Sequence, residues 1–406
     1  MSEPVFNPLD EAFQRDPYPV YRRFREREPI HWSEAGGFWL LTAHEDIAWV
    51  LKDRRFGRDW GAQMEVFYGP AWREEPIWQY SVETLLFMNP PAHTRIRKLV
   101  SHAFTAKRIE GLKPRIFAIT DGLIDQVIDD GGMEVCTQFA NPLPVQVICE
   151  MLGVPAERVG EITRLVRTLM LSFEVRPLSR EELDACNDAL ATMEAYFRAE
   201  VAERKRRPRE DLLTVLVQAE SEGDRLSERE LIWNVIQIFA GGFETTANAI
   251  GNALLALFQQ PAALTRLREQ VAQGGELPLG AVEELFRYDI STQIGGRNAM
   301  MPVEYKGHRF ETGQALFLAL GAGNRDPAVY RPDPDVLDLD RGDVKPVTFG
   351  GGIHYCLGHQ LARIEGQAAF TRLFQRLPTL ELPEADAPQW RRTATIRGLE
   401  RLPARW

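Results

Sequence analysis

One segment restricts the fold more than any other: residues 226 to 260 read LSERELIWNVIQIFAGGFETTANAIGNALLALFQQ. Ser227 and Glu230 have the spacing of an S-x-x-E capping box, and Pro261 ends the pattern. We therefore expect one helix of about 33 residues, roughly 50 Å long. Because it is apolar on most sides, this helix is predicted to be buried in the middle of a large domain.

The middle of this segment, AGGFETT, does not suit a dry core. Gly241 and Gly242 each cost roughly 1 kcal/mol of helix propensity, and a buried Glu244 is expensive unless it is paired. Two interpretations remain open. The segment is either a helix–helix contact made by small residues, or a kink at which the helix opens onto a cavity.

The remaining pattern indicates a mainly α fold with small β-sheets. HWSEAGGFWLLTA near the start reads as strands, and the stretch from Pro90 to about Arg287 is mostly helical. EYKGHRFETGQALFLAL reads as strands and turns, followed by a long coil rich in Pro, Asp and Gly, and then by a helix beginning near His359. There is no internal repeat or linker, so we expect residues 1–406 to form a single domain.

Charge and cysteine content exclude several classes of protein. The formal net charge of −10 argues against binding to nucleic acid or to an anionic membrane. The four cysteines are scattered, so a disulfide framework is not expected and a cytoplasmic location is favoured. No signal peptide or membrane span is recognisable, and the sequence predicts a soluble protein.

The second informative segment is FGGGIHYCLGHQLAR, residues 349 to 363, which contains Cys356. Four roles compete for this cysteine. It could be inert and buried, or a nucleophile with His354 as its base. It could bind zinc together with His354 and His359, although no fourth ligand is offered nearby. It could also be a thiolate ligand of haem iron.

The residue types around Cys356 make physical sense for a thiolate ligand. A helix N-terminus places the sulfur in a positive dipole, where the N–H groups of Leu357 and Gly358 can point at it. Glycines 350 to 352 permit a tight bend and close approach of the backbone to a flat macrocycle. Phe349 can shield the sulfur by packing beside it.

FGGGIHYCLG matches the F-x-x-G-x-H-x-C-x-G loop of the cytochrome P-450 family at every fixed position, and LAR continues the match. The chain thus resembles the soluble bacterial members of that family. The resemblance implies the cytochrome P-450 fold, with a long central helix over haem b and a cysteine loop beneath it. It makes Cys356 the axial iron ligand and places Phe349, Gly350, His354 and Gly358 in the haem-binding loop.

Other segments also resemble family motifs. Glu284 and Arg287 fit its E-x-x-R pair, which the family joins to an arginine of the following coil, here Arg341. AGGFETT fits (A/G)-G-x-(D/E)-T, which places Glu244 and Thr245 over the distal face of the haem. In the family this pair handles dioxygen and relays protons from solvent.

The resemblance also implies a set of cations that bind the haem propionates. His93 and Arg97 in NPPAHTRIRKLV resemble the residues at the haem edge in the family. Arg297 and His354 resemble the other propionate donors. Two carboxylates buried at a haem edge require such partners.

Together these features predict a monooxygenase that receives electrons from a separate ferredoxin or flavodoxin-type donor. Residues 93 to 115 carry a local excess of positive charge suited to an acidic donor. The aromatic stretch from Trp60 to Phe87, by resemblance the loop over the pocket, predicts a hydrophobic small-molecule substrate. Further pocket candidates are Phe243, Ile294 and Ile396, and we expect a monomer.

Two alternatives within haem-thiolate chemistry remain open at this stage. One is an enzyme that uses peroxide or catalyses a reaction without external electrons. The other is a non-catalytic haem-binding sensor or carrier. The intact Glu244–Thr245 pair argues against both alternatives.

Overall fold

The computed structural model describes residues 6–174, 176–221, 223–272, 274–342 and 345–406. The chain divides into two units that alternate along the sequence. Unit 1 comprises Met1–Phe56, Leu112–Pro144 and Thr245–Trp406, and unit 2 comprises Gly57–Gly111 and Val145–Glu244. The mainly α architecture with small sheets that the sequence predicts is confirmed.

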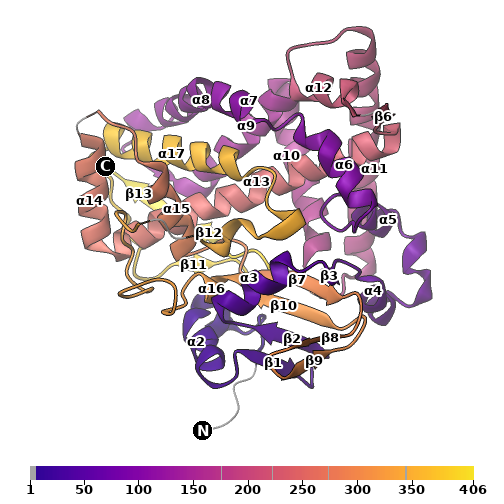
Figure 1. The fold of residues 1–406 in the computed structure, drawn as a ribbon. Coiled ribbons are helices and arrows are strands. Elements are labelled where there is room, and N and C mark those ends of the chain that lie inside the picture. The colour runs from indigo at the N-terminus through magenta and orange to yellow at the C-terminus, as the bar shows by residue number, and fades with distance from the viewer. Residues whose placement is uncertain (1–5, 175, 222, 273, 343–344) are drawn as a thin grey trace. The chain divides into compact units, whose positions relative to one another are not determined.

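Unit 1 is built on a five-stranded sheet with the order β1-β2-β10-β7-β3. Its inner strand β10 (Ala315–Ala319) runs parallel to β2 (Phe38–Leu41) and antiparallel to β7 (Ile294–Ala299), as Figure 1 shows. The other two strands are β1 (Ile30–Ser33) and β3 (Phe56–Gly57). The first segment predicted to form strands thus supplies β1 and β2 on one side of the sheet, and the later segment supplies the central strand β10.

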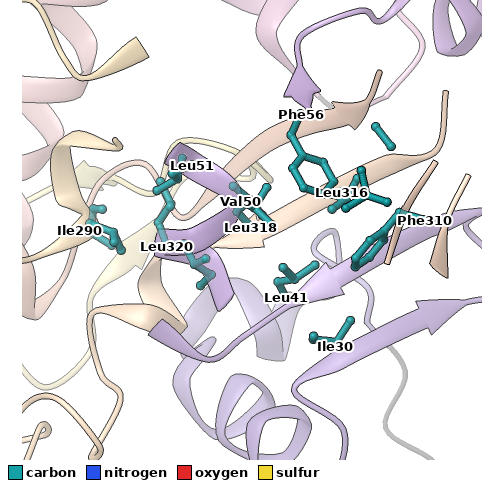
Figure 2. Close-up of a cluster of buried hydrophobic side chains, with 14 residues drawn as sticks. Ile30, Leu41, Val50, Leu51, Phe56, Ile290, Phe310, Leu316, Leu318 and Leu320 are labelled. Atoms are coloured by element: carbon teal, nitrogen blue, oxygen red, sulfur yellow. The ribbon is translucent and has the colours of Figure 1, made fainter. Parts of the chain in front are cut away.

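A hydrophobic cluster packs against this sheet (Figure 2). Leu316 and Leu318 of β10, Leu41 of β2 and Val50 of α3 (His44–Lys52) contribute fully buried side chains to it. Burial of each such side chain stabilises the fold by roughly 1.5–3 kcal/mol. Residues from both ends of unit 1 therefore share one core.

Helices and short hairpins complete unit 1. α17 (His359–Arg376) lies beside α8 (Lys113–Asp125), α14 (Pro261–Ala272) and α15 (Leu279–Tyr288). The two-stranded sheets pair β4 (Gly132–Glu134) with β13 (Pro403–Arg405), β8 (Val303–Tyr305) with β9 (His308–Phe310), and β11 (Gln389–Trp390) with β12 (Leu399–Arg401). The shorter helices are α1 (Glu11–Arg15), α2 (Tyr18–Arg27) and α16 (Leu320–Gly323).

Unit 2 is almost entirely helical. Its longest complete helix, α11 (Arg180–Arg206), begins with a capping box between Ser179 and Glu182 and packs against α10 (Val159–Met170). The other helices are α4 (Gly61–Tyr68), α5 (Pro76–Val82), α6 (Ala92–Ser101), α7 (Ala106–Gly111) and α12 (Leu212–Gln218), and β5 (Glu220–Ser221) pairs with β6 (Asp224–Arg225). α9 (Pro142–Leu152) runs from one unit into the other.

The long helix predicted from the sequence is α13 (Glu228–Gln259). Its capping box is present: the Glu230 N–H donates to Ser227 Oγ, and the Ser227 N–H donates to the Glu230 carboxylate. The helix is continuous through Gly241 and Gly242, so no break of the helix accompanies the two glycines. Among the residues described, no helix combines the length and apolar character needed to cross a bilayer.

Candidate active site

Cys356 lies in a short loop that leads into α17. It is two residues before the N-cap, Gly358, and its N–H donates a 3.0 Å hydrogen bond to the carbonyl of Phe349. This bond closes the loop over the glycines. The loop thus presents the cysteine at the N-terminal end of a long helix, where a thiolate is favoured by the helix dipole.

Cys356 differs from the other three cysteines in its exposure. It is half-buried, whereas Cys136, Cys149 and Cys186 are buried. Desolvation by burial raises the pKa of Cys136 and Cys149 to about 12 and that of Cys186 to about 11. These three thiols therefore stay protonated and inert at neutral pH, which leaves Cys356 as the chemically available one.

Two glycines, Gly350 and Gly352, give the cysteine loop its backbone conformation and its close contact with α3. Gly350 and Gly352 have φ values of 69° and 64°, a region that other residues rarely adopt. A Cβ atom on Gly352 would lie 2.1 Å from the carbonyl oxygen of Leu51 in α3. Gly352 thus allows the loop to approach the end of α3 closely, and the approach of the glycines to a macrocycle stays a prediction.

Three side chains surround the loop from α17 and the preceding turn. His359 Nδ1 lies 3.0 Å from the Cys356 carbonyl oxygen, and its ring meets that of Phe349 edge to face at 6.2 Å. The Arg363 guanidinium lies over the Phe349 ring, 5.1 Å from its centroid. The sequence analysis did not single out Arg363, although LAR was part of the matching motif.

Arg297 on β7 is a buried cation. Its side chain is 2% exposed, and among the described residues its one recorded acceptor is the carbonyl of Gly296, at 2.8 Å. Burial lowers its pKa to about 10. A buried guanidinium that lacks a carboxylate partner is costly unless an anionic group is bound beside it. Arg297 therefore fits an anion-binding role such as that of a propionate donor.

Glu284 and Arg287 form the expected pair on α15. Arg287 Nε and Nη2 donate to the two Glu284 carboxylate oxygens at 2.6 and 2.7 Å. Arg341 joins from the coil, with Nε 3.1 Å from Glu284 Oε1. It also donates to the carbonyls of Asp333 and Val336 and thereby holds the coil that precedes the cysteine loop.

The predicted distal pair lies on α13, where Glu244 is buried and Thr245 is half-buried. Of the remaining predicted residues, His93 is buried and Arg97 half-buried, one turn apart on α6. The division of the chain places His93, Arg97, Phe243 and Glu244 in unit 2. Unit 1 holds Thr245, Ile294, Arg297, Phe349, Gly350, His354, Cys356, Gly358 and Ile396.

The pocket candidates are buried apolar side chains. In unit 1, residues 291–293 pair with 395–397, which brings the segments of Ile294 and Ile396 together. In unit 2, Phe243 lies under the Arg167 guanidinium at 5.8 Å. Of the aromatic residues between 60 and 87, Trp72, Trp78 and Tyr80 are buried anchors, whereas Phe87 stacks on Phe173 with its ring half-exposed.

Some cations of the basic stretch from 93 to 115 form ion pairs with acidic residues of the same chain. Arg95 is paired with Asp224 and Glu230, and Lys113 with Glu276. Lys107, Arg108 and Arg115 are exposed. The surface charge is therefore smaller than the sequence excess indicates.

The cysteine at a helix N-terminus, the Glu284–Arg287–Arg341 network and the acid–alcohol pair on α13 are the features that the family resemblance predicts. The chain belongs to the cytochrome P450 family, whose model matches residues 58–396. It therefore binds haem b and is a monooxygenase. In the part of the chain that the structure describes, no cluster of three His, Cys, Asp or Glu side chains is arranged to hold a metal ion, so the zinc alternative has no geometric support.

Relatives with assigned names span the whole chain. The chain is 35% identical over 411 residues to the polyketide biosynthesis cytochrome P450 PksS of Bacillus subtilis (strain 168), covering 99% of each. It is 34% identical over 406 residues to 6-deoxyerythronolide B hydroxylase of Saccharopolyspora erythraea, covering 97% of each. The crystal structure of CalO2 matches with a TM-score of 0.90 at 32% identity, covering 100% of this chain and 99% of that one.

Proposed function

We propose that this chain, acting as one catalytic domain, hydroxylates or epoxidises a hydrophobic small molecule. It uses O2 and electrons from a separate ferredoxin or flavodoxin-type donor. The observation that carries the proposal is the Glu244–Thr245 pair, an acid and an alcohol in adjacent positions of one continuous helix. A protein that only carried haem would not need a buried carboxylate there.

The residues that resemble the family's haem-binding set would hold the cofactor. Bound haem supplies the activation of dioxygen and the transfer of one oxygen atom to substrate. The Cys356 thiolate would bind its iron, with Phe349, Gly350 and Gly358 shaping the loop. By the resemblance, Arg297 and His354, with His93 and Arg97 of α6, would donate hydrogen bonds to the two propionates. The buried guanidinium of Arg297 supports this assignment most directly.

The residues of α13 manage protons. By the resemblance, the Thr245 hydroxyl would donate a hydrogen bond to the oxygen substrate, and the Glu244 carboxylate would pass protons from solvent to the site. Because proton delivery must be aimed at one oxygen atom, the two groups act together. Without the hydroxyl, protons would not be directed to the site, and reducing equivalents would be consumed without product.

The substrate is an apolar molecule bound among buried side chains. By the resemblance, Phe243, Ile294 and Ile396, which are all buried, would contribute apolar surface. The name of PksS associates one full-length relative with polyketide biosynthesis, and the name of another gives it as a hydroxylase of 6-deoxyerythronolide B. A polyketide-like molecule is therefore the first substrate class to test.

The electron donor docks on the exposed cations of the basic stretch. Among them, Lys107 and Arg108 lie on α7. An acidic iron–sulfur or flavin protein is attracted to such a surface, and the attraction is screened by salt. We expect the rate of haem reduction by the donor to fall as ionic strength rises and to fall further in Lys107→Glu.

The experiment that tests the function compares wild type with Thr245→Ala under NADH and a surrogate reductase–ferredoxin pair. Polyketide, fatty acyl and terpenoid substrates are screened for product. Wild type should form an oxygenated product, whereas Thr245→Ala should consume NADH with at least about tenfold less product. Thr246→Ala on the same helix is the control. The proposal would be contradicted if Thr245→Ala formed product at the wild-type yield. It would also be contradicted if the wild type formed product only when peroxide was added.

A further inference from the structure

Arg363 of α17 makes two contacts at once. Its guanidinium lies over the Phe349 ring, 5.1 Å from the centroid, and its Nε lies 2.8 Å from the Glu283 carboxylate of α15. The two charged side chains are 21% and 30% exposed. A partly buried pair of this kind is screened somewhat less by salt than a fully exposed pair.

The packing of α15 against α17 holds this arrangement in place. A Cβ atom on Gly366 would lie 2.7 Å from side-chain atoms of Phe286 and Val282, so the two helices approach closely at that glycine. Glu284, next to Glu283, is fixed in the buried network with Arg287. Both residues of the Arg363–Glu283 pair therefore lie on helices that are packed firmly against each other.

Phe349 connects this pair to the cysteine loop. Its carbonyl oxygen accepts the Cys356 N–H at 3.0 Å, so the ring and the cysteine belong to the same closed turn. A cation over the ring face is held by the ring quadrupole. The Arg363 cation and its carboxylate partner Glu283 are thus linked to the cysteine loop through the Phe349 ring.

We propose that Arg363 and Glu283 form an outer charge pair that sets the reduction potential of the haem bound by Cys356. This inference rests on the proposed cysteine ligation. One-electron reduction of ferric haem adds one negative charge at the iron–thiolate centre, which a nearby cation favours and a nearby carboxylate opposes. Arg363 raises the potential, and Glu283 limits that rise.

The test is a reductive titration of the reconstituted enzyme with dithionite and mediator dyes, followed in the visible spectrum. Glu283→Gln should raise the Fe(II)/Fe(III) ratio at a fixed potential, and Arg363→Gln should lower it. A unit charge at this depth changes the ratio by on the order of tenfold, which is 59 mV for one electron. Arg363→Lys keeps the charge and should stay within a fraction of that change.

The chain offers a matched control on the same helix. Arg372 also lies 5.1 Å from a phenylalanine centroid, that of Phe117, and pairs with Asp121 at 3.2 Å. It is nine residues beyond Arg363, about 13 Å further along α17. Arg372→Gln removes the same kind of charge and ring contact and should leave the haem potential unchanged.

The outcomes separate this inference from the proposed function. The inference would be overturned if the haem potentials of Glu283→Gln and Arg363→Gln equalled that of Arg372→Gln while the ferrous–CO spectrum stayed normal. The proposed function would then still stand. If Arg363→Gln does not retain haem, Glu283→Gln decides, because it leaves the Arg363–Phe349 contact intact. A wild-type ferrous–CO complex without a thiolate-type long-wavelength Soret band would instead overturn the cysteine ligation itself.

Discussion

Arg287 donates two hydrogen bonds to Glu284, and both side chains are almost completely withdrawn from solvent, at 1% and 4% exposure. Arg341 approaches the same carboxylate with 5% exposure. Two cations and one anion are thus buried together, and backbone carbonyls accept the remaining guanidinium N–H groups. This network joins α15 to the coil before the cysteine loop.

Removal of one partner from this network should be severely destabilising. Glu284→Gln leaves two buried guanidinium groups without a carboxylate, and we expect the free energy of unfolding to fall by about 3–5 kcal/mol. Denaturant unfolding of the haem-free protein measures it. The exposed pair of Arg266 and Asp340 is the control, since Asp340→Asn should cost less than about 1 kcal/mol. Equal effects would show that burial of the network contributes little.

Gly352→Ala should disturb the cysteine loop specifically. The new methyl group would collide with the Leu51 carbonyl, and a non-glycine residue at φ 64° carries backbone strain of about 1–3 kcal/mol. We expect lower stability and weaker haem retention. Gly122→Ala in the interior of α8 meets no atom within 4 Å and should stabilise the protein by about 0.5–1 kcal/mol. Normal haem retention in Gly352→Ala would refute the docking of the loop on α3.

Arg297→Gln should change stability and cofactor binding in opposite directions. The haem-free protein loses a buried charge that burial disfavours, so its free energy of unfolding should stay equal or rise. Haem affinity should fall about 10- to 100-fold, because a charge-assisted hydrogen bond to a propionate is lost. Haem titration and denaturant unfolding measure the two quantities. Arg309→Gln on β9, an exposed cation paired with Glu311, should alter neither.

The start of α11 should lose stability in acid. The Arg176 guanidinium, followed by the Ser179 N–H, lowers the pKa of Glu182 from 4.5 to about 2. Since the folded state favours the carboxylate, its contribution is complete above pH 4.5 and is lost as the pH falls toward 2. The carboxylate is partly exposed, so we expect about 1 kcal/mol. The difference in stability between wild type and Glu182→Gln should shrink across this window, and a constant difference would contradict the assignment.

Features encoded by local spacing could be predicted from the sequence. The capping box of Ser227 and Glu230 occupies four consecutive residues, and the E-x-x-R pair occupies one helix turn. Arg341 was reached through the family resemblance and lies where it was expected. The roles assigned to Glu244, Thr245 and the propionate donors stay predictions, to be tested by the variants above.

Features that depend on distant segments could not be predicted. Nothing in the GGG sequence at residues 350–352 shows that Gly352 faces Leu51, since that contact arises only when the sheet and α3 have formed. The sequence excess of charge between 93 and 115 overstated the surface because Arg95 and Lys113 find acids more than 100 residues away. Arg363 and Glu283 were overlooked for the same reason: neither residue is unusual until α15 and α17 are packed.

The contact of Gly352 with Leu51 also has a consequence for folding. About 300 residues separate the two positions. Closing so long a loop costs conformational entropy before any contact rewards it, which makes the docking of the cysteine loop on α3 an intrinsically slow step of folding.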